Sequence, residues 1–219
     1  MSMDFTPTAR RLGLLSALAT AILLVAYAIT LVIGLALLNS PADPIGNPWF
    51  TMLEVEIIVM MPAIVALFVA VHAWAPEHAK TLSFSSVIFM GVLAGITCSL
   101  HFVVLTLSRQ AEFAGQPWLP LFMSFEWPSV VYALDILAWD IFFAVAILFA
   151  APVFSGSRIT GWIRGLMITS GVLSLAGLSG VVLGSMQWRN IGIVGYVPVF
   201  LVVVVLLAIL FYRTPPQEV

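Results

Sequence analysis

The chain has 219 residues, of which 62% are hydrophobic and only 8% are charged, and its formal net charge is −2. Soluble domains carry a charge on roughly a quarter of their residues, so this composition excludes an ordinary soluble protein. The small net charge argues against nucleic acid as a partner. A single cysteine, Cys98, excludes an internal disulfide and a cysteine-based zinc site.

Long apolar runs recur along the whole sequence and predict an all-α, polytopic protein whose main partner is the lipid bilayer. The six runs that are long enough to cross a bilayer cover approximately residues 12–38, 50–74, 82–108, 128–154, 161–186 and 191–212. Little sequence remains outside them, so we predict a single six-span transmembrane domain over residues 1–219. The first run has about 27 residues, too long for the roughly 7–15 apolar residues of a secretory signal, and we interpret it as an uncleaved anchor.

Two connections differ from the short turns that join the other spans. Residues 39–49 contain three prolines and a glycine, a composition typical of a loop. Residues 109–127 combine aromatic side chains with prolines, and we expect this segment to lie in the membrane interface and to cover whatever lies beneath it. Pro62 falls near the middle of the second span and predicts a kink there.

Glycines spaced four residues apart occur in the third and fifth spans and predict close contacts between helices. The pairs are Gly91 with Gly95, Gly161 with Gly165, and Gly180 with Gly184. None of them belongs to a phosphate-binding loop that follows a strand, so we assign them to packing rather than to ligand binding.

An even number of spans places both termini on the same side of the membrane. With the N-terminus in the cytoplasm, six of the eight Lys and Arg residues are cytoplasmic, namely Arg10, Arg11, Lys80, Arg158, Arg164 and Arg213. Arg109 and Arg189 are then on the outer side, in agreement with the positive-inside rule. We therefore predict a multi-pass protein of the cytoplasmic membrane with cytoplasmic N- and C-termini.

Polar residues of four spans gather at similar depths. An ionised side chain in hydrocarbon is costly and normally faces a bundle interior or a wet cavity. With a helical rise of about 1.5 Å per residue, these residues lie roughly 6–16 Å below the outer surface. The residues predicted to bind a ligand or protons are Glu54, Glu56, Thr97, His101, Asp135, Trp139, Asp140 and Tyr196.

The most natural pair in this group joins the third and fourth spans. His101 and Asp135 share a depth of about 10 Å, and we expect them to contact each other. Asp140 points roughly 140° away from Asp135 on a regular helix, so we expect it to reach Thr97 or another helix. A static hydrogen bond between His101 and Asp135 is the alternative to a working site, although such bonds contribute only about 1 kcal/mol in membranes.

The two glutamates of the second span lie closer to the outer surface. We expect Glu54 and Glu56 to contact water or a positive partner, such as Arg109 or Arg189. His72 lies near the opposite end of the same span and is interpreted as an interfacial residue.

Metal and cofactor sites receive little support from the sequence. His101, Asp135 and Glu54 could together hold zinc or iron, but no HExxH, CxxC or Glu-x-x-His spacing accompanies them, so no metal is predicted. His72 and His101 lie near opposite membrane faces, too far apart to share a haem iron. No Gly-x-Ser-x-Gly motif predicts a hydrolase, and the only lysine, Lys80, falls in a turn, which leaves no retinal-type Schiff base. No cofactor is assigned.

These observations favour a protein that binds or transports a small solute, or relays protons, in a cavity open to the outer side. An intramembrane enzyme that uses His101 and the aspartates on a lipid-soluble substrate is the alternative. A non-catalytic subunit, in which Asp140 meets a partner helix, is a third reading, and a homo-oligomer stays open. A closed apolar pocket that opens sideways to lipid would favour the enzyme, whereas a water-filled vestibule would favour transport.

Overall fold

Helices form the regular structure of the computed structural model, which describes residues 5–40 and 43–216. Six helical segments are long and apolar enough to cross a membrane, so the prediction of an all-α, multi-pass membrane protein is confirmed. The first three spans are α1 (Pro7–Ala36), α2 (Trp49–Trp74), and η1 (Glu77–Ala79) with α3 (Lys80–Leu107). α2 remains helical on both sides of Pro62.

The last three spans are composite. The fourth consists of α5 (Val130–Ile136), η3 (Leu137–Phe143), α6 (Ala144–Ala150) and η4 (Ala151–Val153). The fifth consists of α7 (Arg158–Gly177) and α8 (Ser179–Val182). The sixth consists of η5 (Met186–Arg189), α9 (Asn190–Val194), η6 (Gly195–Val199) and α10 (Phe200–Arg213). The predicted spans overlap these six helical segments, and their ends differ from the helix bounds by up to five residues.

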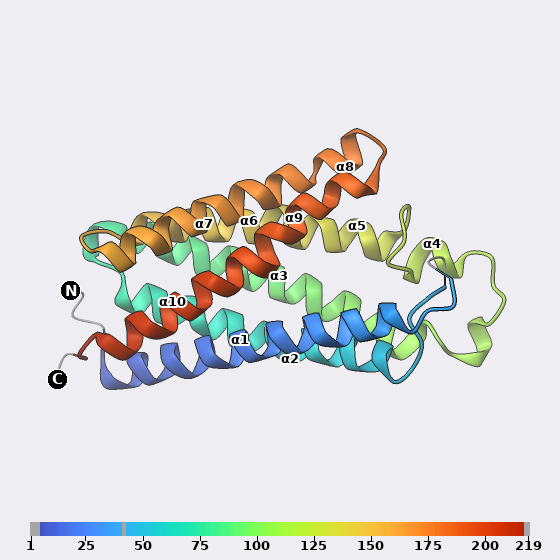
Figure 1. Ribbon diagram of the computed structural model, residues 1–219, viewed down its shortest axis with the longest axis horizontal. Coiled ribbons are helices and arrows are strands. Elements are labelled where there is room, and N and C mark those ends of the chain that lie inside the picture. Colours follow the sequence, from blue (N-terminus) through green and yellow to red (C-terminus); the bar gives the residue numbers. More distant parts are fainter. Residues whose placement is uncertain (1–4, 41–42, 217–219) are drawn as a thin grey trace.

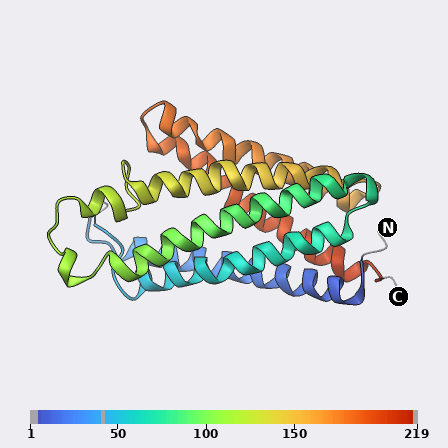
Figure 2. The ribbon, with the colours of Figure 1, turned by 180° about the vertical axis from the view of Figure 1, so that it is seen from behind.

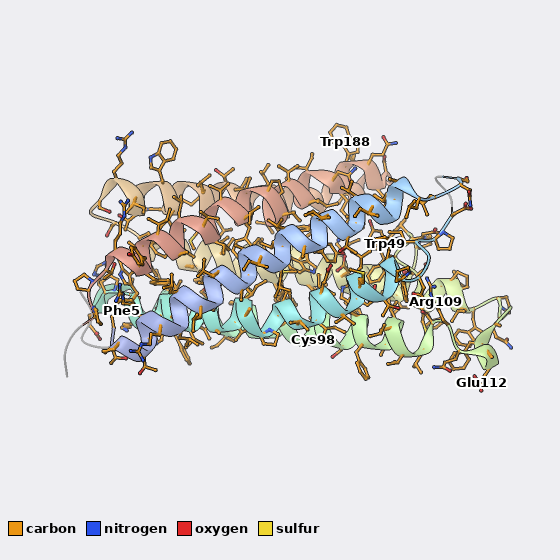
Figure 3. All side chains as sticks on the ribbon, turned by 60° about the horizontal axis from the view of Figure 1, so that its bottom comes forward. Phe5, Trp49, Cys98, Arg109, Glu112 and Trp188 are labelled. Carbon is orange, nitrogen blue, oxygen red and sulfur yellow. The ribbon has the colours of Figure 1, made fainter. Side chains whose placement is uncertain are left out.

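The spans run along the long axis of the molecule, and both termini lie at the same end, here called the terminal end (Figure 1). The opposite, distal end carries α4 (Leu119–Met123) and the turn beyond α8 (Figures 1 and 2). The segment 109–127 forms η2 (Ala111–Phe113) and α4 at this end. Figure 3 places Phe5 at the terminal end and Trp49 and Trp188 toward the distal end. The cytoplasmic location of the terminal end remains a prediction from charge.

Capping residues decide where two of the spans begin. The Thr6 hydroxyl oxygen accepts a hydrogen bond from the Ala9 N–H at 3.2 Å, and Pro7 occupies the first helical position. α1 therefore begins before the apolar run from which the span was predicted. Ser157 and Thr160 form a capping box that starts α7, again ahead of the predicted boundary.

The N-terminal segment ties the first span to the last. Phe5 is fully buried, and its ring stacks on Phe211 of α10 with 5.9 Å between the ring centroids. Arg10 donates a hydrogen bond from Nε to the Phe211 carbonyl oxygen at 3.0 Å, where the unpaired carbonyls of the helix end favour a cation. Gly13 leaves room for this ring, because a Cβ there would lie 2.8 Å from it. Aromatic packing thus holds the N-terminal segment against α10.

The fourth span lies at the centre of the bundle. In its most apolar 18-residue window 61% of the residues are buried, against 22% in α1. Phe143 anchors this centre, since its ring lies 5.0 Å from that of Phe200, which in turn lies 6.5 Å from Phe68. The span that carries the two aspartates is therefore the one with the least contact with lipid.

The glycine pairs predicted to mediate helix contacts do not all do so. A Cβ added at Gly91, Gly95, Gly161 or Gly165 would meet nothing within 4 Å, so the prediction is wrong for these two pairs, which face away from the bundle. Close contact occurs instead between α7 and the start of the sixth span. A Cβ at Gly177 would lie 3.0 Å from the Gly192 Cα, and one at Gly195 would lie 2.6 Å from the Ser170 carbonyl oxygen.

The contact at Gly195 provides a test of this packing. Gly195→Ala must separate η6 from α7, because the new methyl group meets a backbone oxygen, and we expect a loss of about 1–3 kcal/mol in the free energy of unfolding. The midpoint of thermal unfolding in detergent measures this loss. Gly165→Ala is the matched control, since it adds the same methyl group where nothing lies within 4 Å. Equal midpoints for the two variants would contradict the assigned helix contact.

Candidate functional site

Two π-helical segments face each other in the distal half of the bundle. η3 interrupts the fourth span, and η6, which contains Pro198, interrupts the sixth. The ring of Trp139 in η3 lies 5.2 Å from that of Tyr196 in η6, and both residues are buried. π-helical turns inside transmembrane helices redirect side chains and occur frequently at functional sites.

A buried arginine joins these two spans. The Arg189 guanidinium donates hydrogen bonds from Nη2 to Asp135 Oδ2 at 2.7 Å and from Nε to Asp140 Oδ2 at 3.3 Å. Its Nη1 donates to the Tyr132 hydroxyl oxygen at 3.2 Å, and its Cζ lies 4.6 Å from the centre of the Tyr132 ring. Only 5% of Arg189 is exposed. We call Tyr132, Asp135, Asp140 and Arg189 the arginine cluster.

The π-helical turn explains why both aspartates reach one arginine. On a regular helix, residues five positions apart diverge by about 140°, which is why the sequence predicted that Asp135 and Asp140 could not share a narrow site. In η3 the hydrogen bonds follow an i→i+5 pattern, which brings residues five positions apart onto nearly the same face. Asp140 was predicted to reach either Thr97 or another helix. The second alternative is correct, because its partner is Arg189 of the sixth span.

Asp140 is packed against the glycine contact between the fifth and sixth spans. Its side chain is fully buried, and one carboxylate oxygen, Oδ1, has no hydrogen-bond partner. A Cβ at Gly192 would lie 2.5 Å from this oxygen, and one at Gly177 would lie 2.9 Å from it. The two glycines therefore make the space that the carboxylate occupies.

A second polar pair joins α2 to α3. His101 Nδ1 lies 2.7 Å from Glu54 Oε2, and both side chains are buried. The other ring nitrogen, Nε2, is buried without a hydrogen-bond partner. The imidazole stacks on Phe125 with 5.0 Å between the ring centroids. Phe125 belongs to residues 109–127, so this segment contacts one of the polar residues, His101.

The predicted contact between His101 and Asp135 is wrong. Asp135 binds Arg189, and His101 binds Glu54. The physical reason is the position of Arg189, which was expected on the outer side but is buried and provides a positively charged partner for both aspartates.

The remaining glutamate of α2 also differs from expectation. Glu56 Oε1 accepts a hydrogen bond from Thr30 Oγ1 of α1 at 3.0 Å, while its Oε2 is buried without a partner. Arg109, one of its two expected partners, instead donates to the Ile45 carbonyl oxygen and lies over the Phe50 ring. The side chain of Glu56 therefore faces α1 rather than a basic residue.

Two tyrosines complete the surroundings of the acids. Tyr196 is buried beside Trp139, and Tyr27 lies partly buried on α1, three residues before the Thr30 that binds Glu56. Thr97 is fully buried, and its hydroxyl has no partner. We call this whole group the acidic site. Its members are Tyr27, Glu54, Glu56, Thr97, His101, Tyr132, Asp135, Trp139, Asp140, Arg189 and Tyr196.

Sequence reasoning missed Tyr27, Thr30, Phe125, Tyr132 and the buried position of Arg189. One signal could have found Arg189: buried carboxylates need a positive partner on another span, and Arg189 immediately precedes the last apolar run. The tyrosines and Thr30 carry no comparable signal, because such residues are common in membrane helices.

The structure does not bring together His101, Asp135 and Glu54, the three residues of the weak metal-site alternative. Within residues 5–40 and 43–216, no group of three or more His, Cys, Asp or Glu side chains is placed to hold a metal ion. The acids are spread over several helices, and two of them are bound to one guanidinium.

Two apolar grooves open sideways on the bundle. One, of about 400 Å³, lies between α1 and the sixth span near Pro198. The other, of about 420 Å³, lies between α3, α4 and α5. No carboxylate, histidine or arginine lines either groove.

The fold and the site define a multi-pass membrane protein with a buried, charged cluster in the distal half of its helix bundle. Comparison of the chain with protein-family models, with curated protein sequences and with solved structures finds no match. The chemistry of the acidic site therefore has to be derived from its own geometry.

The arginine cluster predicts a characteristic pattern of stabilities. Arg189→Met leaves two buried carboxylates without their cation, and we expect it to lower the free energy of unfolding by about 3–5 kcal/mol. Adding Asp135→Asn and Asp140→Asn to that variant removes the uncompensated charge and should recover much of the loss. Thermal unfolding in detergent measures both steps, and the exposed Arg109→Met serves as the control. A triple variant less stable than Arg189→Met alone would contradict the assigned charge pairing.

Proposed function

We propose that the chain takes up protons or a small cationic solute from the distal side of the membrane and passes them through the acidic site. The observation that supports this proposal is the imbalance of charge in the site. Four carboxyl groups, on Glu54, Glu56, Asp135 and Asp140, share one arginine and one histidine.

The imbalance cannot be relieved by the side chains that surround the acids. Even with His101 protonated, four carboxylates would face two positive charges, and Glu56 is bonded only to a hydroxyl group. Unpaired carboxylates in an apolar medium are too costly to persist and either bind protons or attract a cation. A site that is short of positive charge is suited to taking up protons or cations.

Unpartnered polar atoms support the same conclusion. Glu56 Oε2, Thr97 Oγ1, His101 Nε2 and Asp140 Oδ1 are each buried without a hydrogen-bond partner. Buried polar groups are nearly always satisfied, so several unsatisfied ones in one region favour a site that exchanges protons, water or a ligand. Each of these four atoms can accept a hydrogen bond, and His101 can accept one at Nε2 when it is neutral.

The direction of uptake follows from the position of the site and the charge of the loops. At the terminal end Phe5 stacks on Phe211, whereas the polar residues lie in the distal half, where Phe125 stacks on His101. The positive-inside rule assigns the distal end to the outer side. Access from outside is therefore proposed, with residues 109–127 as the cover.

The alternatives receive less support from the geometry. An enzyme acting on a lipid-soluble substrate would need its acid and base to line an apolar pocket, and the two lateral grooves carry neither. A subunit role was suggested by an Asp140 in need of a partner helix, but Asp140 binds Arg189 of the same chain. We therefore propose a carrier rather than an enzyme or a subunit.

Proton movement in liposomes tests the proposal. The purified protein is reconstituted with a pH-sensitive dye inside, and a potassium diffusion potential is imposed. We expect wild-type protein to carry protons, and Glu54→Gln or Asp135→Asn to slow this flux by about tenfold or more, because each removes a carboxylate that can hold a proton.

Glu77→Gln is the matched control, since Glu77 lies in η1 at the terminal end, away from the acidic site. Its flux should equal that of the wild type. Fluxes in the Glu54 and Asp135 variants that also equal the wild-type flux would refute the proposed role of the acids.

A further inference from the structure

We propose that the Nε2 atom of His101 accepts the incoming proton and that Glu54 is the residue that positions His101 for this role. The inference rests on the proposed function: it narrows the species that is carried to the proton and assigns the atom that receives it. Three features support it, namely the hydrogen bond between the two side chains, the unpartnered ring nitrogen and the apolar surroundings of the imidazole.

The hydrogen bond between His101 and Glu54 determines which ring nitrogen carries the hydrogen. His101 Nδ1 lies 2.7 Å from Glu54 Oε2, and each of the two side chains is 5% exposed. An ionised carboxylate only accepts hydrogen bonds, so a neutral imidazole beside it carries its hydrogen on Nδ1. The Nε2 atom of this tautomer presents a lone pair.

The Nε2 atom of His101 has no hydrogen-bond partner among the described residues, although it is buried. The opposite tautomer would place an unsatisfied N–H group there, and buried N–H groups without a partner are rarer in proteins than buried acceptors without one. The geometry therefore favours an unprotonated Nε2, which is the atom of the pair that can take up a proton.

The surroundings of the imidazole suit a proton better than a larger solute. Phe125 stacks on the ring with 5.0 Å between the centroids, and it also packs against an apolar cluster of Leu100, Val104 and Val131. Only 4% of His101 is exposed, so a solute would reach Nε2 only by displacing packed side chains. A proton needs only the lone pair. His101 also lies within about two turns of the distal end of α3, the side from which uptake is proposed.

Among the neighbouring charged groups, Glu54 is the one that bonds to His101. The titratable groups on the distal parts of the elements packed against α3 are Glu54, Glu56, Tyr132, Asp135 and Asp140. Glu56 is bonded to Thr30, and the last three are bonded to Arg189. Glu126 follows Phe125 in the chain and is exposed. A positive charge on His101 is therefore stabilised by direct contact with Glu54.

The proton transfer that we infer is balanced within the pair. The incoming proton bonds to the lone pair of Nε2 and converts the imidazole into an imidazolium that stays paired with the Glu54 carboxylate. Transfer of the Nδ1 proton to Glu54 Oε2 then leaves a neutral imidazole and a neutral carboxylic acid. One positive charge is added to the pair, and no further reactant is needed.

The protonation of the ring nitrogens tests this assignment. The full chain is labelled with ¹⁵N-histidine, reconstituted in liposomes and studied by solid-state NMR. It contains three histidines, so His72→Gln combined with His78→Gln leaves His101 as the only source of the signal. At high pH we expect a hydrogen on Nδ1 and none on Nε2. As the pH is lowered, the Nε2 signal should move to that of a protonated nitrogen.

Two substitutions of Glu54 separate positioning of the ring from simple packing. Glu54→Leu removes the acceptor, so we expect the hydrogen of the neutral ring to move from Nδ1 to Nε2. Glu54→Gln keeps an acceptor oxygen, so the original tautomer should persist without the charge that stabilises the imidazolium. Both variants should slow the proton flux by about tenfold or more, and only Glu54→Leu should change the tautomer.

Histidine substitutions provide the matched comparison of flux in liposomes. His101→Gln should slow the flux by about tenfold or more, because it removes the accepting atom. The control is the variant with both His72→Gln and His78→Gln, and its flux should equal that of the wild type. His72 lies at the terminal end, where its Nδ1 is 2.8 Å from the Ser83 hydroxyl oxygen. Gel filtration and circular dichroism establish that each variant is folded, and the NMR measurement needs no change within the pair.

The outcomes distinguish the inference from the function on which it rests. A hydrogen on Nε2 at every pH at which protons are carried would overturn the inference. Wild-type flux in a folded His101→Gln variant, with Asp135→Asn still slow, would also overturn it and leave the proposed function intact. Absence of proton flux in the wild type would refute the two together.

Discussion

The ion pairing of Arg189 with Asp135 and Asp140 is the interaction on which the distal half of the molecule depends. It joins the fourth span, which is the most buried of the six, to the beginning of the last one. A guanidinium in an apolar interior needs one carboxylate to balance its charge. Two carboxylates exceed that charge by one. The site therefore carries a surplus of acid by construction, and every functional property proposed for it follows from that surplus.

Backbone geometry makes this pairing attainable. A regular helix would turn the two aspartates away from each other, and the π-helical segment η3 turns them toward the same arginine. The glycines at positions 177 and 192 clear the space for Asp140, and Gly180 lets the backbone of Arg189 approach α8. The π-helical segment and the three glycines thus both allow Arg189 to pair with the two aspartates.

The six spans could be predicted from the sequence, but the pairing of the charged side chains in the acidic site could not. Apolar length predicts the six spans, because a bilayer imposes that length whatever the side-chain details. Depth along a helix also follows from residue number, which is why Glu54, His101, Asp135 and Asp140 were all assigned to one half of the bundle. The direction in which a side chain points from its helix is harder to predict. The π-helical turn has no sequence signature here, and it changes the face of the span on which Asp140 lies. Arg189 was expected on the outer side of the membrane, outside the spans, whereas it lies buried at the end of η5.

The two π-helical segments also divide their spans into independent halves. Each i→i+5 turn holds one residue more than the regular helix around it, so the parts before and after it are out of phase with a single helical repeat. Removing one residue from either segment would restore the regular helical repeat there, so the parts of the span on either side could keep their orientation. The gain or loss of a single codon at these points would therefore change which side chains of the segment itself point into the bundle, without rotating the rest of the span.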